Sequence, residues 1–229
     1  MTEPVGPEAA SEPHPGGGAE RRHPDVSART IGGWTLAAAV VDAVAVVSFL
    51  LFYAVEIGRP RPHVFGPLSD ASSALFDLLL LPLLWFVLQR LPRRTPARGY
   101  ALVSVVATAV GAVNSALLVL GLLNDAVSFV LTMVVIGVQA GWFVLVGRRG
   151  RETLGVNAGI ARWALLAGLG MLVAIVVLIP AALLPPQSAV AIVLWIVGGA
   201  VGGIAWISWP IWLALVGRSL RRMQLTLVG

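Results

Sequence analysis

Four polar side chains lie inside long apolar stretches of the chain and are the residues best suited to chemistry: Asp42, Tyr53, Asp77 and Gln139. A charged side chain in hydrocarbon is costly, so an acidic residue within a membrane span is a functional candidate by default. The functional interpretation is an intramembrane site for a proton or a cation. The structural alternative is a hydrogen-bonded Asp42 that holds the first helix in its bundle.

Helical spacing places Asp42 among other polar and aromatic residues. At about 100° per residue, Asp42, Phe49, Tyr53 and Glu56 share one face of a helix and form an acidic stripe that also carries a hydroxyl group. Asp42 is expected toward the inner side of the membrane and Asp77 toward the outer side. The sequence therefore predicts that these two carboxyl groups do not share a proton.

Small and hydroxylated residues occupy facing positions on the third and fourth apolar stretches. Counting from the turn between them places Thr108 level with Gln139, and Ser115 level with Thr132. This pattern predicts close helix packing and interhelical hydrogen bonds, with a polar pore lining as the alternative. Asn114 lies off this face. The facing residues are Ser104, Thr108, Gly111 and Ser115 in the third stretch, and Ser128, Thr132 and Gln139 in the fourth.

Glycine pairs four residues apart indicate where helix backbones approach each other, because glycine leaves no side chain between them. They predict packing within one chain, or contact with a second copy or another membrane protein. The helix-packing residues are Gly137, Gly141, Gly198, Gly202 and Gly203.

The elements that carry these residues are membrane helices. The chain is 58% hydrophobic and 12% charged, whereas soluble domains carry about 25% charged residues. Six apolar runs, each close to the roughly 20 residues needed to cross a bilayer, predict an all-α polytopic membrane helix bundle. A disordered tail is expected over 1–30, a membrane domain over 31–220 and a short tail over 221–229. The predicted spans are about 34–56, 72–89, 100–123, 126–147, 162–184 and 189–217.

Arginine placement predicts the topology. All basic residues are arginines, and if the N-terminal tail is inside, all but Arg59 and Arg61 fall on inner segments. This bias predicts both termini in the cytoplasm of a plasma-membrane protein, with anionic lipid headgroups at the inner arginine clusters. Three spans end alike, with Trp85, Trp142 or Trp212 one to two turns before an arginine, which is typical of an aromatic belt at the membrane interface.

Several classes of site are absent from the sequence. There is no cysteine, and His14, His23 and His63 all fall outside the predicted spans. These facts argue against thiol chemistry, haem ligation and a helical His-Glu-x-x-His metal site. We expect no catalytic residues, metal, cofactor or nucleic-acid partner, and we expect His63 to be an exposed loop residue.

Three functional hypotheses remain for a chain whose composition is typical of small six-span bacterial membrane proteins. The first is a non-catalytic membrane protein with a structural, regulatory or partner-binding role. The second is a small transporter or channel for a proton, cation or small solute that uses Asp42. The third is a membrane enzyme acting on lipids, which is disfavoured because no catalytic constellation is present.

Overall fold

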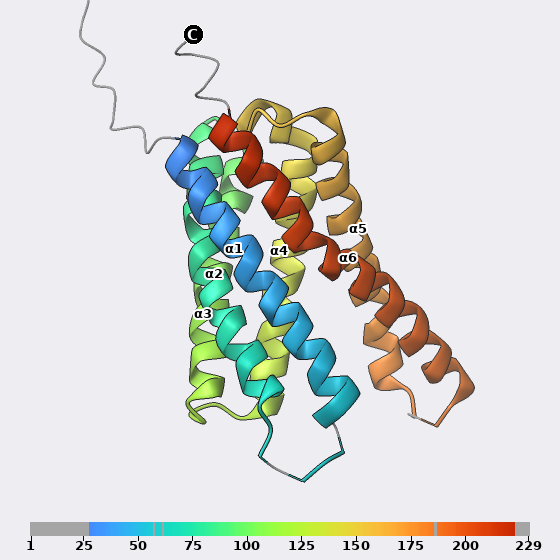
Figure 1. The fold of residues 1–229 in the computed structure, drawn as a ribbon. Coiled ribbons are helices and arrows are strands. Elements are labelled where there is room, and N and C mark those ends of the chain that lie inside the picture. Colours follow the sequence, from blue (N-terminus) through green and yellow to red (C-terminus); the bar gives the residue numbers. More distant parts are fainter. Residues whose placement is uncertain (1–27, 57, 61, 186, 223–229) are drawn as a thin grey trace, which may run out of the picture.

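The protein folds as a bundle of long helices (Figure 1). The structure, a computed structural model, describes residues 28–56, 58–60, 62–185 and 187–222. No strand occurs in these ranges, and six helices are long and apolar enough to span a membrane. This confirms the predicted fold class. The elements are α1 (Ala28–Leu51), the π-helical turn η1 (Phe52–Glu56), α2 (Phe65–Arg90), α3 (Pro96–Val119), α4 (Asp125–Thr153), α5 (Ala158–Leu183) and α6 (Ala189–Arg222).

The helices form a closed ring. Each helix packs against its neighbours in the sequence, and α1 also packs against α6 (Figure 1). The start of α1, the end of α6 and the α2–α3 and α4–α5 connections all lie at one end of the bundle, here called the arginine end. Among the described residues, Arg59 is the one arginine at the opposite end. The arginines at or near the arginine end are Arg29, Arg90, Arg93, Arg94, Arg98, Arg148, Arg149, Arg151, Arg162, Arg218, Arg221 and Arg222.

The helices extend beyond the predicted spans. α1 begins at Ala28 instead of Trp34, α2 begins at Phe65 instead of Ser72, and α6 continues to Arg222. Hydropathy marks the part of a helix that lies in hydrocarbon, whereas a helix can continue through the polar interface. Residues 1–27 and 223–229, which cover most of the two predicted tails, lie outside the described ranges.

Side chains in the connections define where four of the helices begin. The side-chain oxygens of Thr95, Asn124, Asn157 and Ser188 accept backbone N–H groups in the first turns of α3, α4, α5 and α6 at 3.4, 2.8, 2.9 and 3.1 Å. Such N-caps satisfy donors that have no partner within the helix. The turns between apolar runs are therefore encoded locally.

Glycines set the closest helix contacts. A Cβ atom added at Gly32 of α1 would lie 2.7 Å from the carbonyl oxygen of Gly217 in α6, and one added at Gly217 would lie 2.9 Å from that of Gly32. α4 and α5 meet in the same way, since a Cβ atom at Gly147 would lie 2.5 Å from the backbone nitrogen of Leu165. Because lipid tails are as apolar as leucine, such backbone contact is a main source of helix association in membranes.

The predicted packing glycines of α6 divide between two faces. A Cβ atom at Gly198 would lie 2.8 Å from Leu178, and one at Gly202 would lie 2.9 Å from Ala174, so both residues pack against α5. A Cβ atom at Gly203 would meet no described atom within 4 Å. Gly203 therefore makes no close contact with the described part of its own chain.

Aromatic side chains fill the interior near the arginine end. Trp142 and Trp212 have no exposed surface and pack edge to face, with ring centroids 5.9 Å apart. Phe143 stacks on Trp209 at 4.5 Å. The prediction of an aromatic belt is wrong for Trp142 and Trp212, and only Trp85, which is 51% exposed, lies at the surface as expected. The distance of a tryptophan from an arginine gives its depth, but the helix face on which it lies decides whether it meets lipid.

Candidate functional site

Two carboxyl groups lie in the interior of the bundle. Asp42 is 2% exposed near the middle of α1, and Asp77 is 7% exposed near the middle of α2. The hydroxyl of Ser69 donates to the carbonyl of Ala45 at 3.2 Å and links the same two helices. The two aspartates lie at similar depth on two helices that pack against each other, so two ionised carboxylates here would repel.

The expectation that the two aspartates occupy opposite depths is therefore wrong. It followed from placing the start of α1 at Trp34 and that of α2 at Ser72. Because both helices begin earlier, each aspartate is at mid-helix.

Asp77 lies where α2, α3 and α4 meet. The side-chain amide of Gln139 donates to Asp77 Oδ1 at 2.8 Å and to Thr108 Oγ1 at 3.3 Å. A Cβ atom at Gly111 of α3 would lie 2.5 Å from Asp77 Oδ2, so glycine is needed to admit the carboxyl group. This hydrogen bond confirms the prediction that Thr108 and Gln139 lie at the same depth in the bundle. We call Asp42, Asp77, Thr108 and Gln139 the buried acidic cluster.

The carboxyl group of Asp42 has fewer hydrogen-bond partners than that of Asp77 among the described residues. Asp42 Oδ2 is buried and has no hydrogen-bond partner among the described residues. A buried polar atom without a partner is costly. A carboxyl oxygen in this position can take up a proton or contribute to the coordination of a small cation.

Tyr53 does not join the buried acidic cluster. Its side chain is 52% exposed on the membrane-facing surface, and its ring lies 4.7 Å from that of Phe49. The predicted stripe assumed a regular α-helix from Asp42 to Glu56. Phe49, which precedes the π-helical turn η1, is already 37% exposed, and η1 is wider than an α-turn and rotates the residues that follow it around the helix axis.

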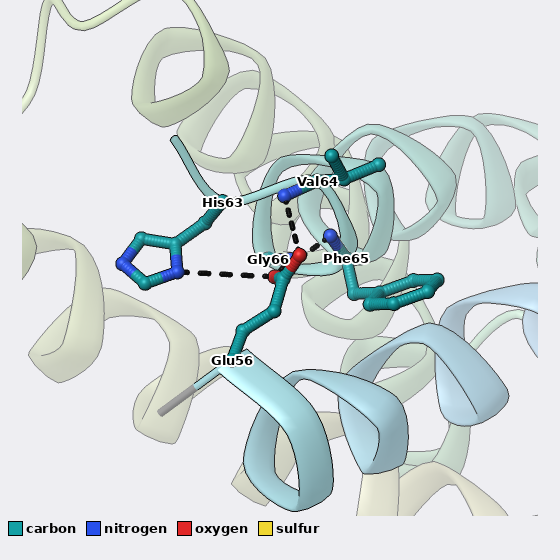
Figure 2. A network of polar contacts seen from close by, with 5 residues as sticks. All are labelled: Glu56, His63, Val64, Phe65 and Gly66. Carbon is teal, nitrogen blue, oxygen red and sulfur yellow. Dashed lines mark hydrogen bonds and ion pairs between the residues drawn. The ribbon is translucent and has the colours of Figure 1, made fainter. Parts of the chain in front are cut away.

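Glu56 closes the loop between η1 and α2, at the end opposite the arginine end (Figure 2). Its carboxylate accepts the backbone N–H groups of Val64 and Phe65 at 2.7 and 2.9 Å, and that of Gly66 at 3.4 Å. Val64 itself provides no side-chain cap for α2, so Glu56 takes that role from the preceding helix. His63 Nδ1 lies 4.0 Å from Glu56 Oε2, and only 21% of the His63 side chain is exposed. The expectation that His63 is exposed is therefore wrong.

Asn114 connects α3 to α4. Its amide nitrogen lies 3.1 Å from both the Ser128 and Thr132 hydroxyl oxygens. The sequence placed Asn114 off the polar face of the third span, whereas the structure brings it to Thr132 in place of the predicted Ser115. A signal was available, because Asn114 follows Gly111 by three residues and so shares its side of the helix.

The predicted glycines of α4 differ in role. The hydroxyl of Tyr100 lies against Gly141 and donates to the carbonyl of Val138 at 2.8 Å. Gly141 therefore makes room for a side chain of α3. Gly137 has no close neighbour, since a Cβ atom there would lie 3.8 Å from Ile175.

The site has few charged groups that could bind metal. Within the described residues, no group of three or more His, Cys, Asp or Glu side chains could hold a metal ion. Searches against protein-family models, curated proteins and solved structures found no match to this chain. The buried acidic cluster is therefore the feature of this chain from which a function can be inferred.

Proposed function

We propose that this multi-pass membrane protein moves protons or a small monovalent cation across the membrane through the buried acidic cluster. The observation that supports this proposal is the pair of buried carboxyl groups, Asp42 and Asp77, near the middle of two helices that pack against each other. Two bare charges in such a medium would be strongly disfavoured. A proton or cation that neutralises one of them offsets this cost.

The two aspartates have different roles in this proposal. Asp42 is the binding group, because its Oδ2 has no hydrogen-bond partner in the described part of the chain. Asp77 is oriented by the amide of Gln139. Uptake of a proton at Asp42 removes the repulsion from Asp77, and release of that proton restores it. The net charge of the buried acidic cluster therefore depends on whether Asp42 carries a proton.

The arginine end is proposed to face the cytoplasm, and the membrane is proposed to be the plasma membrane. The concentration of arginines at one end supports this orientation, because positively charged connections are retained on the cytoplasmic side. Both chain termini are then cytoplasmic, and the loop closed by Glu56 is external.

A second candidate is a non-catalytic protein that binds another membrane helix. Cβ atoms added at Gly199 and Gly203 of α6 would meet no described atom within 4 Å. These glycines are four residues apart, which is the spacing of close helix contacts between chains. The neighbouring Ile196 and Ile204 are 66% and 73% exposed and would flank such a contact.

Ion flux into liposomes separates the two candidates. Purified protein would be reconstituted with a pH-sensitive dye and a potassium gradient, and the assay would be repeated with a sodium gradient. We expect flux from the unaltered protein and at least a tenfold loss in Asp42→Asn. Glu152→Gln is the matched control, because it removes an acidic group whose side chain is 73% exposed at the arginine end. Equal flux in Asp42→Asn and the unaltered protein would rule out Asp42 as the binding group. No flux, together with a stable membrane-protein partner, would favour the second candidate.

A further inference from the structure

A groove runs between α5 and α6 on the surface that faces the membrane. Its volume is about 710 Å³, and we call it the α5–α6 groove. The residues that define it are Arg162, Trp163, Leu166 and Gly170 of α5, and Val201 and Ile204 of α6. Apart from Ser208 of α6, whose hydroxyl donates to the carbonyl of Ala205, the groove is apolar along its length, and it has a charged residue at one end.

Small residues form the floor of the groove and large residues form its sides. At Gly170 an added Cβ atom would lie 3.4 Å from the Cβ of Ala205. The two helices therefore approach each other here, and these two small residues form the floor of the groove. Leu166 and Ile204 are 69% and 73% exposed and form the sides. From Arg162 to Gly170 the groove extends about 12 Å at 1.5 Å per residue. A shape of this kind fits an extended hydrocarbon chain.

Arg162 supplies the charge at the mouth of the groove. It lies one turn from the start of α5, at the arginine end, and makes no ion pair with any residue in the described part of the chain. A guanidinium group binds phosphate oxygens through two parallel hydrogen bonds. Trp163 follows it, and tryptophan is favoured at the level of lipid headgroups. The groove therefore has a phosphate-binding group at one end and an apolar body along the rest of its length.

We propose that the α5–α6 groove is a binding site for an anionic phospholipid. One acyl chain lies between α5 and α6, and the phosphate group binds Arg162. A lipid is chosen over a protein helix because the charge at the mouth complements a phosphate. A second groove of about 850 Å³ follows the same plan, with apolar walls that include Val44 and Ile211, and with Arg218 at the arginine end. The proposal does not depend on ion transport by the buried acidic cluster.

Native mass spectrometry of the purified full chain tests the proposal. The protein would be titrated with phosphatidylglycerol and with phosphatidylcholine that carry the same acyl chains. We expect preferential binding of phosphatidylglycerol, and we expect Arg162→Gln to lower its affinity about fivefold, the effect of one basic residue near a lipid surface. Arg151→Gln is the matched control, because it removes the same charge at the same end but outside the groove. It should leave the preference unchanged.

Filling the groove gives a second, independent test. A Cβ atom at Gly170 makes only ordinary contacts, so Gly170→Leu should fold and should occupy the space of the acyl chain. We expect weaker binding of both lipids and an unchanged melting temperature. Equal losses in Arg162→Gln and Arg151→Gln would overturn the proposal, because they would indicate only a general charge effect. Disulfide crosslinking between two copies through Leu166→Cys, in a chain without native cysteine, would overturn it in favour of a second copy in the groove.

Discussion

The amide of Gln139 on α4 donates a hydrogen bond of 2.8 Å to Asp77 on α2, and these two helices are not neighbours in the ring. The contact passes across the interior beside Thr108 and Gly111 of α3. This hydrogen bond connects α2 and α4, which do not pack directly against each other. A side-chain hydrogen bond therefore adds a link between α2 and α4, each of which packs directly on α3.

Replacing Gln139 should destabilise the bundle. Gln139→Leu removes the amide that donates to Asp77, so that Asp77 Oδ1 stays buried but loses this hydrogen bond. We expect a loss of about 1–2 kcal/mol in the free energy of unfolding, measured by equilibrium unfolding in mixed micelles. Gln89→Leu is the control, because Gln89 is exposed at the arginine end. Equal stability of the two variants would contradict the role given to Gln139.

The contact between α1 and α6 should be sensitive to side-chain size at one glycine and insensitive at the next. Gly32→Val places atoms against the backbone of Gly217, whereas a Cβ atom at Gly33 would meet nothing described within 4 Å. Overpacking of this kind costs about 1–3 kcal/mol. We expect Gly32→Val to lower the melting temperature and Gly33→Val to leave it nearly unchanged. The reverse order would show that the helices do not cross at Gly32.

Two fully buried tryptophans should respond differently to the same substitution. Trp212 Nε1 donates to the carbonyl of Ile160 at 2.9 Å, while Trp142 Nε1 has no partner among the described residues. Both Trp212→Phe and Trp142→Phe remove one indole group from the core. We expect Trp212→Phe to cost about 1 kcal/mol more in unfolding free energy, because it also removes a hydrogen bond. Indistinguishable unfolding curves would show that this bond contributes little.

The loop between η1 and α2 should open when Glu56 is shortened. Glu56→Ala removes the acceptor of the N–H groups of Val64 and Phe65. Loss of a helix cap costs about 1 kcal/mol, so amide hydrogen exchange at these residues should accelerate about fivefold. Glu152→Gln, at the other end of the bundle, should leave their exchange unchanged. Slow exchange at Val64 in Glu56→Ala would mean that another group holds the loop.

The orientation of the bundle can be tested without background labelling, because the chain has no cysteine. Arg94→Cys lies in the α2–α3 connection at the arginine end, and Arg59→Cys lies in the loop at the opposite end. We expect a membrane-impermeant maleimide applied to intact cells to label Arg59→Cys and spare Arg94→Cys. Labelling of Arg94→Cys alone would invert the proposed topology.

Much of the fold could be predicted from hydropathy, because a backbone in hydrocarbon must satisfy its own hydrogen bonds within helices. The turn residues Asn124 and Ser188 marked the boundaries well, since their caps act locally. The starts of α1 and α2 were harder to predict from hydropathy, because a helix can continue where the chain leaves the hydrocarbon. That error in length carried over into the predicted depths of Asp42 and Asp77.

The candidate site was partly predictable for the same reason. Thr108 and Gln139 belong to a hairpin with a short turn, so counting from the turn gave their common level, which the hydrogen bond between them confirms. The relation of Asp42 to Asp77 depends on the packing of α1 against α2 across a longer loop. The burial of Trp142 depends on which side of α4 meets α6, and periodicity alone does not determine this.

The closure of the ring has a consequence for biogenesis. α1 leaves the ribosome first and α6 leaves last, yet Gly32 and Gly217 pack backbone against backbone. The flank of α1 that carries Gly32 therefore lacks its α6 neighbour until α6 has been synthesised. Insertion of α6 closes the ring of helices, and a chain truncated after α5 would leave α1 and α5 without the helix that joins them in the bilayer.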